Sequence, residues 1–467
     1  MSDRSRRPSA DRARLAAYEV LEAVRAQDAY TNLVLPHVLA ERRLTGRDAA
    51  FVTELVSGTV RGRGLYDAVL AANVARPLEK LQPSVLDVLR LGTHQILAMR
   101  VPAHAAVGTS VDLVRATVGQ GPAGLVNAVL RKVATLDLGG WVSRVAPDRN
   151  QDPVGYCSVA HSHPRWVVEE LAAALLVDPS TPAGLAELEQ LLAADNEPPL
   201  VTLVARPGLS TVAELEASGA RAGLLSPYAA VLSGGAPADV PAVAEGRAGV
   251  QDEGSQLVAL ALARAEVAGD DRRWLDMCAG PGGKSALLAG LAGTGESRLL
   301  AAELQEHRAR LVRRATRRAG RGLLGVVAAD GARPPWRPST FDRVLLDAPC
   351  SGLGALRRRP EARWRRTPED LAVLQPLQRS LLDSAITSVR PGGVVAYVTC
   401  SPVLGETSQI VQGMLESRDD VVLEDAVPLF EGVPDLRSDE RVLPGTVQLW
   451  PHRHRTDAMF FALLRRR

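Results

Sequence analysis

Apolar side chains recur at three- and four-residue spacing through residues 11–140. This spacing places them on one face of a helix, so the segment is predicted to be helical. Short breakers that contain Gly or Pro separate the periodic stretches, among them 45–46, 62–64, 82–83 and 119–122. Several helices joined by short turns are typical of an all-α bundle.

A different pattern begins near residue 251, where short aliphatic runs alternate with helical segments. Alternating strands and helices predict a mostly parallel, doubly wound sheet. Ligands bind outside the carboxyl ends of the strands in such a sheet, so the residues that follow each run are candidates for a site. The runs predicted to be strands are 273–277, 298–302, 324–328, 342–346 and 393–398.

The intervening residues are richer in Pro and Gly. They contain two short β-like runs, 200–205 and 229–233, with a helix expected near 211–218. We interpret them as a small α+β module behind a helical linker over 164–194. The expected organisation is therefore multidomain, with a helical domain, a linker and small module, and an α/β domain, over residues 1–142, 143–250 and 251–467.

The overall composition fits a globular protein. The chain has 467 residues, of which 46% are hydrophobic and 23% charged, which excludes disordered and collagen-like classes. The first seven residues lack the apolar core of a signal peptide, and no stretch of about 18 apolar residues occurs. We therefore expect a soluble, cytoplasmic protein without a membrane partner.

Charge is distributed unevenly along the chain. The total of +2 divides into +5 for residues 1–142, −7 for 143–250 and +4 for 251–467. Only three basic residues are lysines, and all the others are Arg. Runs of Arg are therefore weak evidence of function in this chain, whereas a lysine inside a motif, such as Lys284, is stronger evidence.

A glycine-rich segment follows the first predicted strand. The residues Asp276-Met-Cys-Ala-Gly-Pro-Gly-Gly-Lys-Ser285 contain three glycines, whereas an ordinary turn from strand to helix needs only one. A Walker A loop would require Gly at position 278, which is Cys, and a dinucleotide fingerprint would require Gly at 285, which is Ser. The remaining candidate is a loop that binds S-adenosyl-L-methionine.

Acidic residues stand at the ends of the next three predicted strands. Glu303, Asp330 and Asp347 follow runs two, three and four. A single acid in this place is most often a turn residue or a helix cap, but three after a glycine-rich turn indicate a ligand site. Glu303 is placed to accept hydrogen bonds from ribose hydroxyls, and Asp330 is placed to meet an adenine amino group.

Four cysteines are too few for a disulfide framework, and no two are spaced as C-x-x-C, so no metal site is expected. Cys350 and Cys400 follow neighbouring predicted strands, which would bring both to one edge of the sheet. The alternative, that a cysteine is a small buried hydrophobic residue, fits Cys157 and could fit Cys278. These patterns leave open which cysteine would act as a nucleophile.

Several motifs resemble the Nop/Sun (Fmu-type) family of RNA cytosine-C5 methyltransferases. The helical region also resembles the NusB fold, at Arg61-Gly-Arg-Gly64 and Gly124–Arg131. The combination is similar to the small-subunit rRNA methyltransferases of that family found in bacteria, and it implies a Rossmann-like class I methyltransferase domain. The motifs that carry the resemblance to the methyltransferase family are 251–257, 276–284, 347–364, 399–401 and 456–461.

The resemblance also implies roles for individual residues. Cys400 would attack C6 of cytosine, and Cys350 would assist release of the product. Asp347 would bond the cytosine edge, and a proton donated to N3 would require a raised carboxyl pKa. Lys284 would lower a thiol pKa or position the substrate. Binding of S-adenosyl-L-methionine would fall to Cys278, Ala279, Gly280, Pro281, Gly282, Gly283, Lys284, Glu303, Arg308, Asp330 and Asp347.

The chain departs from the family pattern at three places. Thr407 and Ser408 follow Glu406 where the family has Asn-Glu, Ala458 replaces a usual Gly, and Glu303 replaces a usual Asp. The first two changes affect local loop geometry, and the third keeps the carboxylate.

The expected partner is small-subunit ribosomal RNA, bound by a monomer. An enzyme that acts on a base takes it out of the stack, so basic residues beside the site would contact phosphates. The helical domain is expected to dock RNA, with simple packing as the alternative. A non-catalytic assembly factor is the alternative for the whole chain, and the sequence does not indicate which cytosine is modified. The candidate phosphate contacts are Arg357, Arg358, Arg359, Arg363, Arg365 and Arg366.

Overall fold

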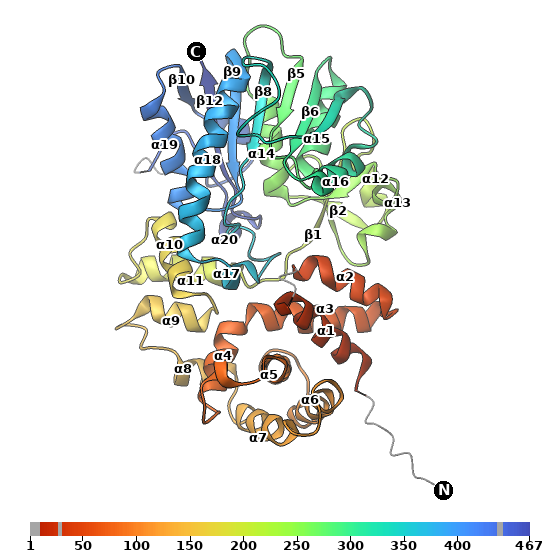
Figure 1. Cartoon of the computed structure of the whole chain (residues 1–467), viewed down its shortest axis with the longest axis vertical. Coiled ribbons are helices and arrows are strands. Elements are labelled where there is room, and N and C mark those ends of the chain that lie inside the picture. Colours follow the sequence, from red (N-terminus) through yellow and green to blue (C-terminus); the bar gives the residue numbers. More distant parts are fainter. Residues whose placement is uncertain (1–9, 27–29, 437–441) are drawn as a thin grey trace. The chain divides into compact units, whose positions relative to one another are not determined.

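The computed structural model describes residues 10–26, 30–436 and 442–467 (Figure 1). The chain forms two compact units. The first contains the residues up to Glu197 together with Leu356–Arg365, and the second contains Pro198–Ala355 and Arg366–Arg467. Both of the predicted domain boundaries, after residues 142 and 250, fall inside a unit. The division into three domains therefore stays a prediction.

The first unit is helical, as the spacing of apolar residues predicts. Helix α5 lies at its centre and contributes Val88, Leu89 and Leu91, none of which is exposed, to the core. Three later helices begin at side-chain caps, which Asp137, Asp152 and Thr181 provide. The helices are α1 (Arg12–Ala26), α2 (Thr31–Glu41), α3 (Gly46–Arg61), α4 (Arg63–Ala71), η1 (Leu78–Lys80), α5 (Pro83–Leu97), α6 (Ala103–Thr117), α7 (Ala123–Val133), α8 (Leu138–Val145), α9 (Pro153–Ala160), α10 (Arg165–Leu175), α11 (Pro182–Ala194) and α17 (Ala362–Arg365).

The second unit begins with a small antiparallel sheet in the order β2-β3-β1-β4. Leu203, Leu215 and Ala230 lie in its separate core. The Glu253 carboxylate accepts hydrogen bonds from three successive backbone N–H groups, those of residues 224–226, and so ties this module to helix α14. The elements are β1 (Val201–Ala205), α12 (Val212–Ala217), β2 (Ala220–Ala222), β3 (Ala229–Leu232), η2 (Pro237–Asp239), α13 (Pro241–Ala244) and β4 (Ala248–Val250).

The main sheet of this unit has the order β10-β12-β9-β8-β5-β6-β7, with β11 paired to β12. All five predicted strands are present, and their pairings with one another are parallel. Two strands beyond them, β12 and β10, continue the sheet antiparallel. The strands are β5 (Arg273–Asp276), β6 (Arg298–Glu303), β7 (Leu323–Ala328), β8 (Phe341–Asp347), β9 (Val389–Thr399), β10 (Val421–Glu424), β11 (Val447–Gln448) and β12 (Phe460–Arg466).

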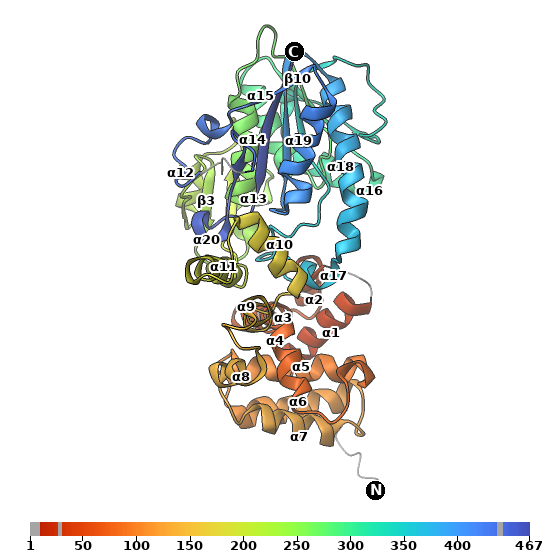
Figure 2. The ribbon, with the colours of Figure 1, turned by 90° about the vertical axis from the view of Figure 1, so that its left-hand side faces the viewer.

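Helices cover both faces of this sheet (Figure 2). Side chains of a strand alternate between its faces. In β9, Val394 and Ala396 pack in the core that contains helices α14 and α15, whereas Val395 and Tyr397 pack in the core that contains α18 and α19. The remaining elements are α14 (Glu253–Arg264), α15 (Gly283–Thr294), α16 (Glu306–Thr316), η3 (Gly320–Gly322), α18 (Pro368–Ser388), η4 (Leu404–Glu406), α19 (Ser408–Ser417), η5 (Val427–Phe430) and α20 (Pro451–His454).

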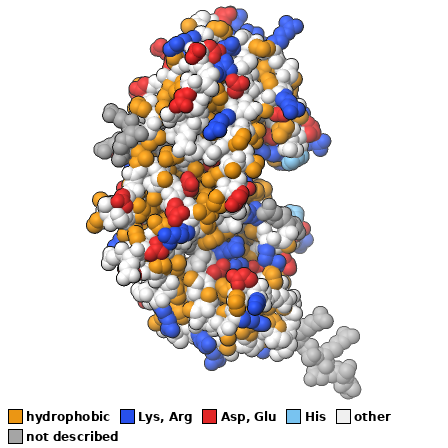
Figure 3. Space-filling view, turned by 60° about the vertical axis from the view of Figure 1, so that its left-hand side comes forward, with side chains coloured by type: hydrophobic (Ala, Val, Ile, Leu, Met, Phe, Trp, Pro, Cys, Tyr) orange, Lys and Arg blue, Asp and Glu red, His pale blue; other side chains and the backbone are white. Residues whose placement is uncertain are grey.

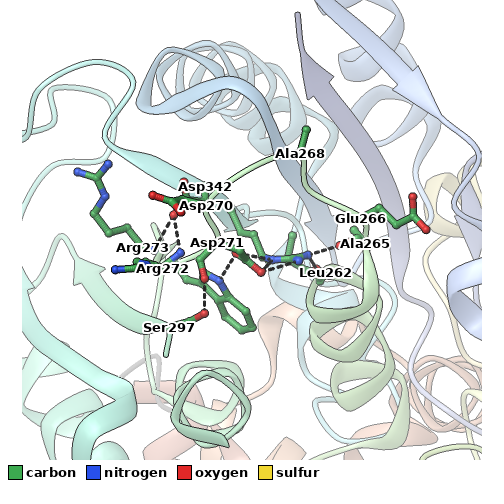
Figure 4. A network of polar contacts seen from close by, with 12 residues as sticks. Leu262, Ala265, Glu266, Ala268, Asp270, Asp271, Arg272, Arg273, Ser297 and Asp342 are labelled. Carbon is green, nitrogen blue, oxygen red and sulfur yellow. Dashed lines mark hydrogen bonds and ion pairs between the residues drawn. The ribbon is translucent and has the colours of Figure 1, made fainter. Parts of the chain in front are cut away.

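A polar network fixes the starts of the central strands (Figure 4). Asp342, in β8, accepts hydrogen bonds from the backbone N–H groups of Arg272 and Arg273 and from the Arg390 side chain. The Arg343 guanidinium bonds the Asp271 carboxylate and two carbonyls at the end of α14. These contacts lie at the ends of the strands opposite to the predicted site, so they hold the register of the sheet rather than a ligand.

Within the described ranges, the helices are all too short or too polar to cross a membrane.

Candidate active site

The glycine-rich segment forms the turn between β5 and α15, as predicted. Gly282 has a φ of +106°, which favours glycine, and a Cβ there would lie 2.8 Å from the Ala315 Cβ and 2.9 Å from the Val312 Cα. The backbone N–H of Gly280 donates to Glu303 Oε2 at 2.9 Å. The loop is therefore packed against helix α16 and held to the end of the neighbouring strand β6.

Glu303 and Arg308 bracket this loop from the second strand. Glu303 is the last residue of β6, its side chain is 6% exposed, and its Oε1 also accepts a hydrogen bond from the Gln305 N–H. Arg308 Nη2 donates to the Gly280 carbonyl at 2.9 Å and lies 3.8 Å from Glu303 Oε2. The structure thus brings three of the predicted cofactor residues into contact.

Asp330 lies at the same edge of the sheet. Residues Glu303 and Ala328 are partners in the parallel pairing of β6 with β7, and Asp330 follows Ala328 by two positions. The Asp330 side chain is exposed, and its Oδ1 accepts a hydrogen bond from the Ala332 N–H at 2.9 Å. The side chain is therefore held by its own turn and remains open to a ligand.

Asp276 is a buried residue of the loop whose side chain the sequence analysis did not single out. Its Oδ2 accepts a hydrogen bond from the Ser285 hydroxyl at 2.6 Å, which ties the end of β5 to α15. Burial raises the pKa of Asp276 to about 7. Its Oδ1 is buried and makes no hydrogen bond to the described residues. A buried acceptor of this kind is satisfied when a ligand donates to it.

Lys284 and Asp347 form an ion pair between the glycine-rich loop and the end of β8. The Lys284 Nζ lies 2.8 Å from Asp347 Oδ2, and the two side chains are 12% and 26% exposed. Burial by itself would lower the pKa of Lys284, but the charge and hydrogen bond of Asp347, with the Cys400 sulfur, outweigh it, so the pKa is raised. Lys284 therefore carries a proton at neutral pH beside the two cysteine loops.

The two predicted cysteines face each other. The Sγ atoms of Cys350 and Cys400 are 3.5 Å apart, after the adjacent strands β8 and β9. The contact with Cys400, burial and the nearby Glu406 charge raise the pKa of Cys350 well above its usual value. At neutral pH Cys350 is therefore a thiol, which can donate a proton but is a poor nucleophile.

The other two cysteines differ from this pair. Cys157 is fully buried in helix α9, and burial raises its pKa to about 12, so it behaves as a hydrophobic core residue, as one alternative predicts. Cys278 lies in the glycine-rich loop, and burial together with the Asp276, Asp347 and Glu303 charges raises its pKa. A thiol held protonated in this way can contact a ligand by packing or through its backbone.

Glu406 is the second buried carboxylate that sequence reasoning missed as a site residue. It is fully buried at the end of η4 and accepts hydrogen bonds from Ser351 and Ser401, the residues that directly follow the two cysteines. The sequence feature that could have identified Glu406 as a site residue is its position in the motif after Cys400. The sequence alone did not reveal its contacts, because they join two segments about fifty residues apart.

The structure contradicts the predicted track of arginines beside Cys350 at its two buried members, Arg357 and Arg363, whereas Arg358 and Arg359 are exposed. Arg363 is fully buried in the helical unit, where its guanidinium donates to the Asn196 side chain and to the Ser162 and Asp195 carbonyls. Arg357 is also buried, and Arg365 donates to the Val24 carbonyl and lies over the Tyr30 ring. These three residues belong to Leu356–Arg365, which is part of the helical unit, and their contacts there give them a structural role.

Surface charge gives little support for an extended phosphate track. On the face shown in Figure 3, basic and acidic side chains of the described residues are interspersed. On helix α16, Arg310 and Arg313 are paired with Glu306. The arginine-rich helix is therefore a solvated face, as the composition of the chain suggests.

Two family descriptions match the chain. The family 16S rRNA methyltransferase RsmB/F matches residues 263–465, and the NusB family matches residues 11–135. A putative methyltransferase of Mycobacterium tuberculosis is 52% identical over the whole length of both chains. The probable ribosomal RNA small subunit methyltransferase B of Bacillus subtilis is 30% identical over 97% of this chain and 98% of its own length.

Solved structures share the fold. The crystal structure of PH0851 superposes with a TM-score of 0.76 over 98% of this chain and 99% of that chain, at 22% identity. NSun6 from Pyrococcus horikoshii, solved with SFG, gives a TM-score of 0.53 over 65% of this chain and 98% of that chain, at 18% identity. The predicted fold class, a NusB-like helical domain with an α/β methyltransferase domain, is confirmed.

Proposed function

Because this chain belongs to the RsmB/F family of 16S rRNA methyltransferases, we propose that it methylates C5 of a cytosine in small-subunit ribosomal RNA, with S-adenosyl-L-methionine as the methyl donor. The observation that carries the proposal is the pair of cysteine sulfurs, 3.5 Å apart at the carboxyl ends of β8 and β9. Two thiols in this place match a reaction that needs a nucleophile and a separate group for release.

The residues at the carboxyl ends of β5, β6 and β7 fit the proposed cofactor. Glu303 offers a carboxylate for ribose hydroxyls, the exposed Asp330 can meet an adenine amino group, and the buried Asp276 Oδ1 lacks a donor. The glycines of residues 278–284 allow the backbone of the loop to approach a ligand closely, and the N–H groups of Gly282 and Gly283 lie at the start of α15. When bound, S-adenosyl-L-methionine supplies a methyl group activated by a sulfonium charge. NSun6 was solved with SFG, an analogue of this cofactor, which supports the same choice.

Cys400 is the proposed nucleophile. Its sulfur adds to C6 of the cytosine, and the electrons of the C5–C6 double bond move to C5, which can then accept a methyl group. The Lys284 ammonium, whose pKa is raised in part by attraction to the Cys400 sulfur, favours the thiolate form of that sulfur. Cys350, as a neutral thiol, is the poorer candidate for this step.

The Lys284–Asp347 pair is proposed to handle the proton at the cytosine edge. Negative charge develops on the ring as Cys400 adds, and N3 must gain a proton or a hydrogen bond. A proton can pass from Lys284 Nζ to Asp347, 2.8 Å away, and from Asp347 to N3. The pair thus supplies the proton that the sequence analysis assigned to Asp347 alone.

Cys350 is proposed to assist release. After methylation the C5 proton is lost to solvent water, the electrons of the C5–H bond re-form the C5–C6 double bond, and the C6–S bond to Cys400 breaks. The Cys350 thiol, in contact with that sulfur, can donate its proton to it. Loss of Cys350 should therefore trap the covalent adduct rather than prevent its formation.

We expect the base to be flipped out of its stack to reach this edge, and the NusB-like unit to contribute to RNA docking. The protein is expected to act as a monomer in the cytoplasm, where ribosomal subunits are assembled.

The proposed function is tested by bisulfite sequencing of small-subunit rRNA from cells that lack the protein, compared with complemented cells. Loss of protection at a single cytosine supports the proposal and identifies the target, whereas an unchanged pattern contradicts it.

A non-catalytic assembly factor is the competing function. It predicts that the purified chain binds rRNA but not S-adenosyl-L-methionine, which calorimetry measures directly. The buried Asp276, the Lys284–Asp347 pair and the facing cysteines favour the enzyme, because an assembly factor has no need of these groups.

A further inference from the structure

We infer that Glu406 is a positioning residue that holds the loops of Cys350 and Cys400 in the geometry that the reaction requires. This inference rests on the proposed function, because it concerns how the two cysteines share that reaction. Glu406 is fully buried, so we assign it no contact with the substrate. It acts through the residues that follow each cysteine in the sequence.

The first support is the set of donors around the carboxylate. Oε1 accepts hydrogen bonds from the Ser351 N–H at 2.7 Å and from Gln378 Nε2 at 3.1 Å. Oε2 accepts from the hydroxyls of Ser351 at 2.5 Å and Ser401 at 2.6 Å. One carboxylate therefore bonds to the residue after each cysteine, and α18 supplies the remaining donor.

The second support is how tightly the two loops are joined at this point. The hydroxyls of Ser351 and Ser401 lie 3.1 Å apart, and the Gly354 N–H donates to the Cys400 carbonyl at 2.9 Å. Gln378 also donates to the Pro349 carbonyl at 2.9 Å, so the segment before Cys350 is tied to α18 as well. A shift of either loop would break hydrogen bonds to Glu406. Because these bonds hold both loops, they also hold the distance between the two sulfurs.

The third support is electrostatic. Glu406 is fully buried, and the four donors to its side chain are uncharged groups, so its charge is little screened where it lies. After the contact with Cys400 and burial, this charge contributes to the raised pKa of Cys350. Cys400 and Glu406 both raise the pKa of Cys350, and Tyr397 also interacts with Cys350. Glu406 therefore favours the neutral thiol at Cys350.

If Glu406 had only a structural role, its replacement would lower stability and change nothing else. The experiment must therefore distinguish a structural role from the positioning role. The Glu406→Gln variant keeps the size of the side chain but removes the charge and replaces an acceptor with a donor. Its matched control is Glu253→Gln. Glu253 is a second buried carboxylate, which accepts three hydrogen bonds where Glu406 accepts four, and it lies far from the cysteines in the sequence and between other elements. Both variants should lose stability, and only the first should change the chemistry of Cys350.

The first measurement is the rate at which iodoacetamide alkylates Cys350 as a function of pH, followed by mass spectrometry of the peptide in a Cys400→Ser background. It requires no RNA. Loss of the Glu406 charge is expected to move the profile to lower pH by about half a unit, roughly a threefold faster reaction at a given pH below the midpoint. The Glu253→Gln profile should match that of the parent. An unmoved Glu406→Gln profile overturns the electrostatic part of the inference.

The second measurement uses the full chain with 16S rRNA and S-adenosyl-L-methionine. Glu406→Gln should lower turnover by about tenfold or more at unchanged cofactor affinity, because the cysteines lose their alignment. Glu406→Asp keeps the charge but is one methylene shorter, so it should lower turnover while leaving the Cys350 profile in place. Glu406→Asp also tests the positioning role if the Glu406→Gln variant does not fold. Wild-type turnover in these variants overturns the inference.

The two failures are distinguishable. If the unmodified chain transfers no methyl group to rRNA, the proposed function fails, whatever the alkylation profile shows. If the chain is active and the Glu406 variants behave as the parent, only the positioning role fails.

Discussion

The Sγ atoms of Cys350 and Cys400 lie 3.5 Å apart, although fifty residues separate them in the sequence. The two residues follow β8 and β9, which pair in parallel and so end at the same edge of the sheet. The contact with Cys400 and burial raise the pKa of Cys350, and the proposed function assigns a different role to each sulfur. The predictions below test that difference and the structure around it.

Replacing each cysteine should have opposite consequences for the protein–RNA adduct. Cys400→Ala should abolish methyl transfer and form no adduct, because the nucleophile is lost. Cys350→Ala should accumulate an adduct that survives denaturation, because the departing sulfur loses its proton donor. Gel electrophoresis of labelled rRNA after denaturation measures both. Cys157→Ala, which removes a buried thiol outside the site, is the control. Normal turnover without an adduct in Cys350→Ala would show that the roles are assigned wrongly.

Breaking the Lys284–Asp347 pair should slow the chemical step more than it weakens cofactor binding. Lys284→Met removes the ammonium 2.8 Å from Asp347 Oδ2 and should lower single-turnover methylation by about a hundredfold or more. Calorimetry with S-adenosyl-L-methionine should show a much smaller change. Lys132→Met, on helix α7 of the other unit, provides the control for loss of a lysine. Equal losses of binding and rate would instead indicate that Lys284 serves the cofactor.

Without ligand, the free energy of unfolding should depend on pH because of Asp276. Its folded-state pKa is raised to about 7, so the folded state holds this proton more tightly than the unfolded chain does. The resulting stabilisation is fully present below the pKa of the unfolded carboxyl, about 4, and is lost as the pH rises through about 7.

Asp276→Asn should remove this dependence, which is on the order of a few kcal/mol at most. Urea unfolding across this pH range, for the parent and the variant, measures it. Parallel pH profiles in the two proteins would mean that Asp276 does not titrate there.

Arg363 should contribute to the stability of the helical unit rather than to RNA affinity. Arg363→Met removes a buried guanidinium that bonds Asn196 and two carbonyls, which leaves these acceptors without donors and should cost about 3 kcal/mol. Thermal unfolding measures the loss. Arg379→Met, an exposed arginine on α18, should have little effect. Weakened rRNA binding with unchanged stability would restore the phosphate contact that the sequence suggested.

Much of this architecture follows from local patterns in the sequence. Aliphatic runs such as 344–346 lie in strands because a buried parallel strand needs apolar side chains on both faces. Gly282 marks the turn of the loop because its φ of +106° is a backbone conformation that other residues adopt only with strain. The placement of Glu303, Asp347, Cys350 and Cys400 at one edge then follows from the rule that parallel strands end together.

Other features depend on contacts between segments that are distant in sequence. The order of the arginines after Cys350 suggested a row of phosphate contacts, yet Arg363 is enclosed by residues near 162 and 196. Glu406 bonds to both cysteine loops only because β8 and β9 bring Ser351 and Ser401 to it. Local periodicity and motif spacing determine the elements and the chemistry that their ends can offer. Which charged groups are buried, and what satisfies them, is decided by tertiary packing, because the desolvation of a charge depends on every segment that surrounds it.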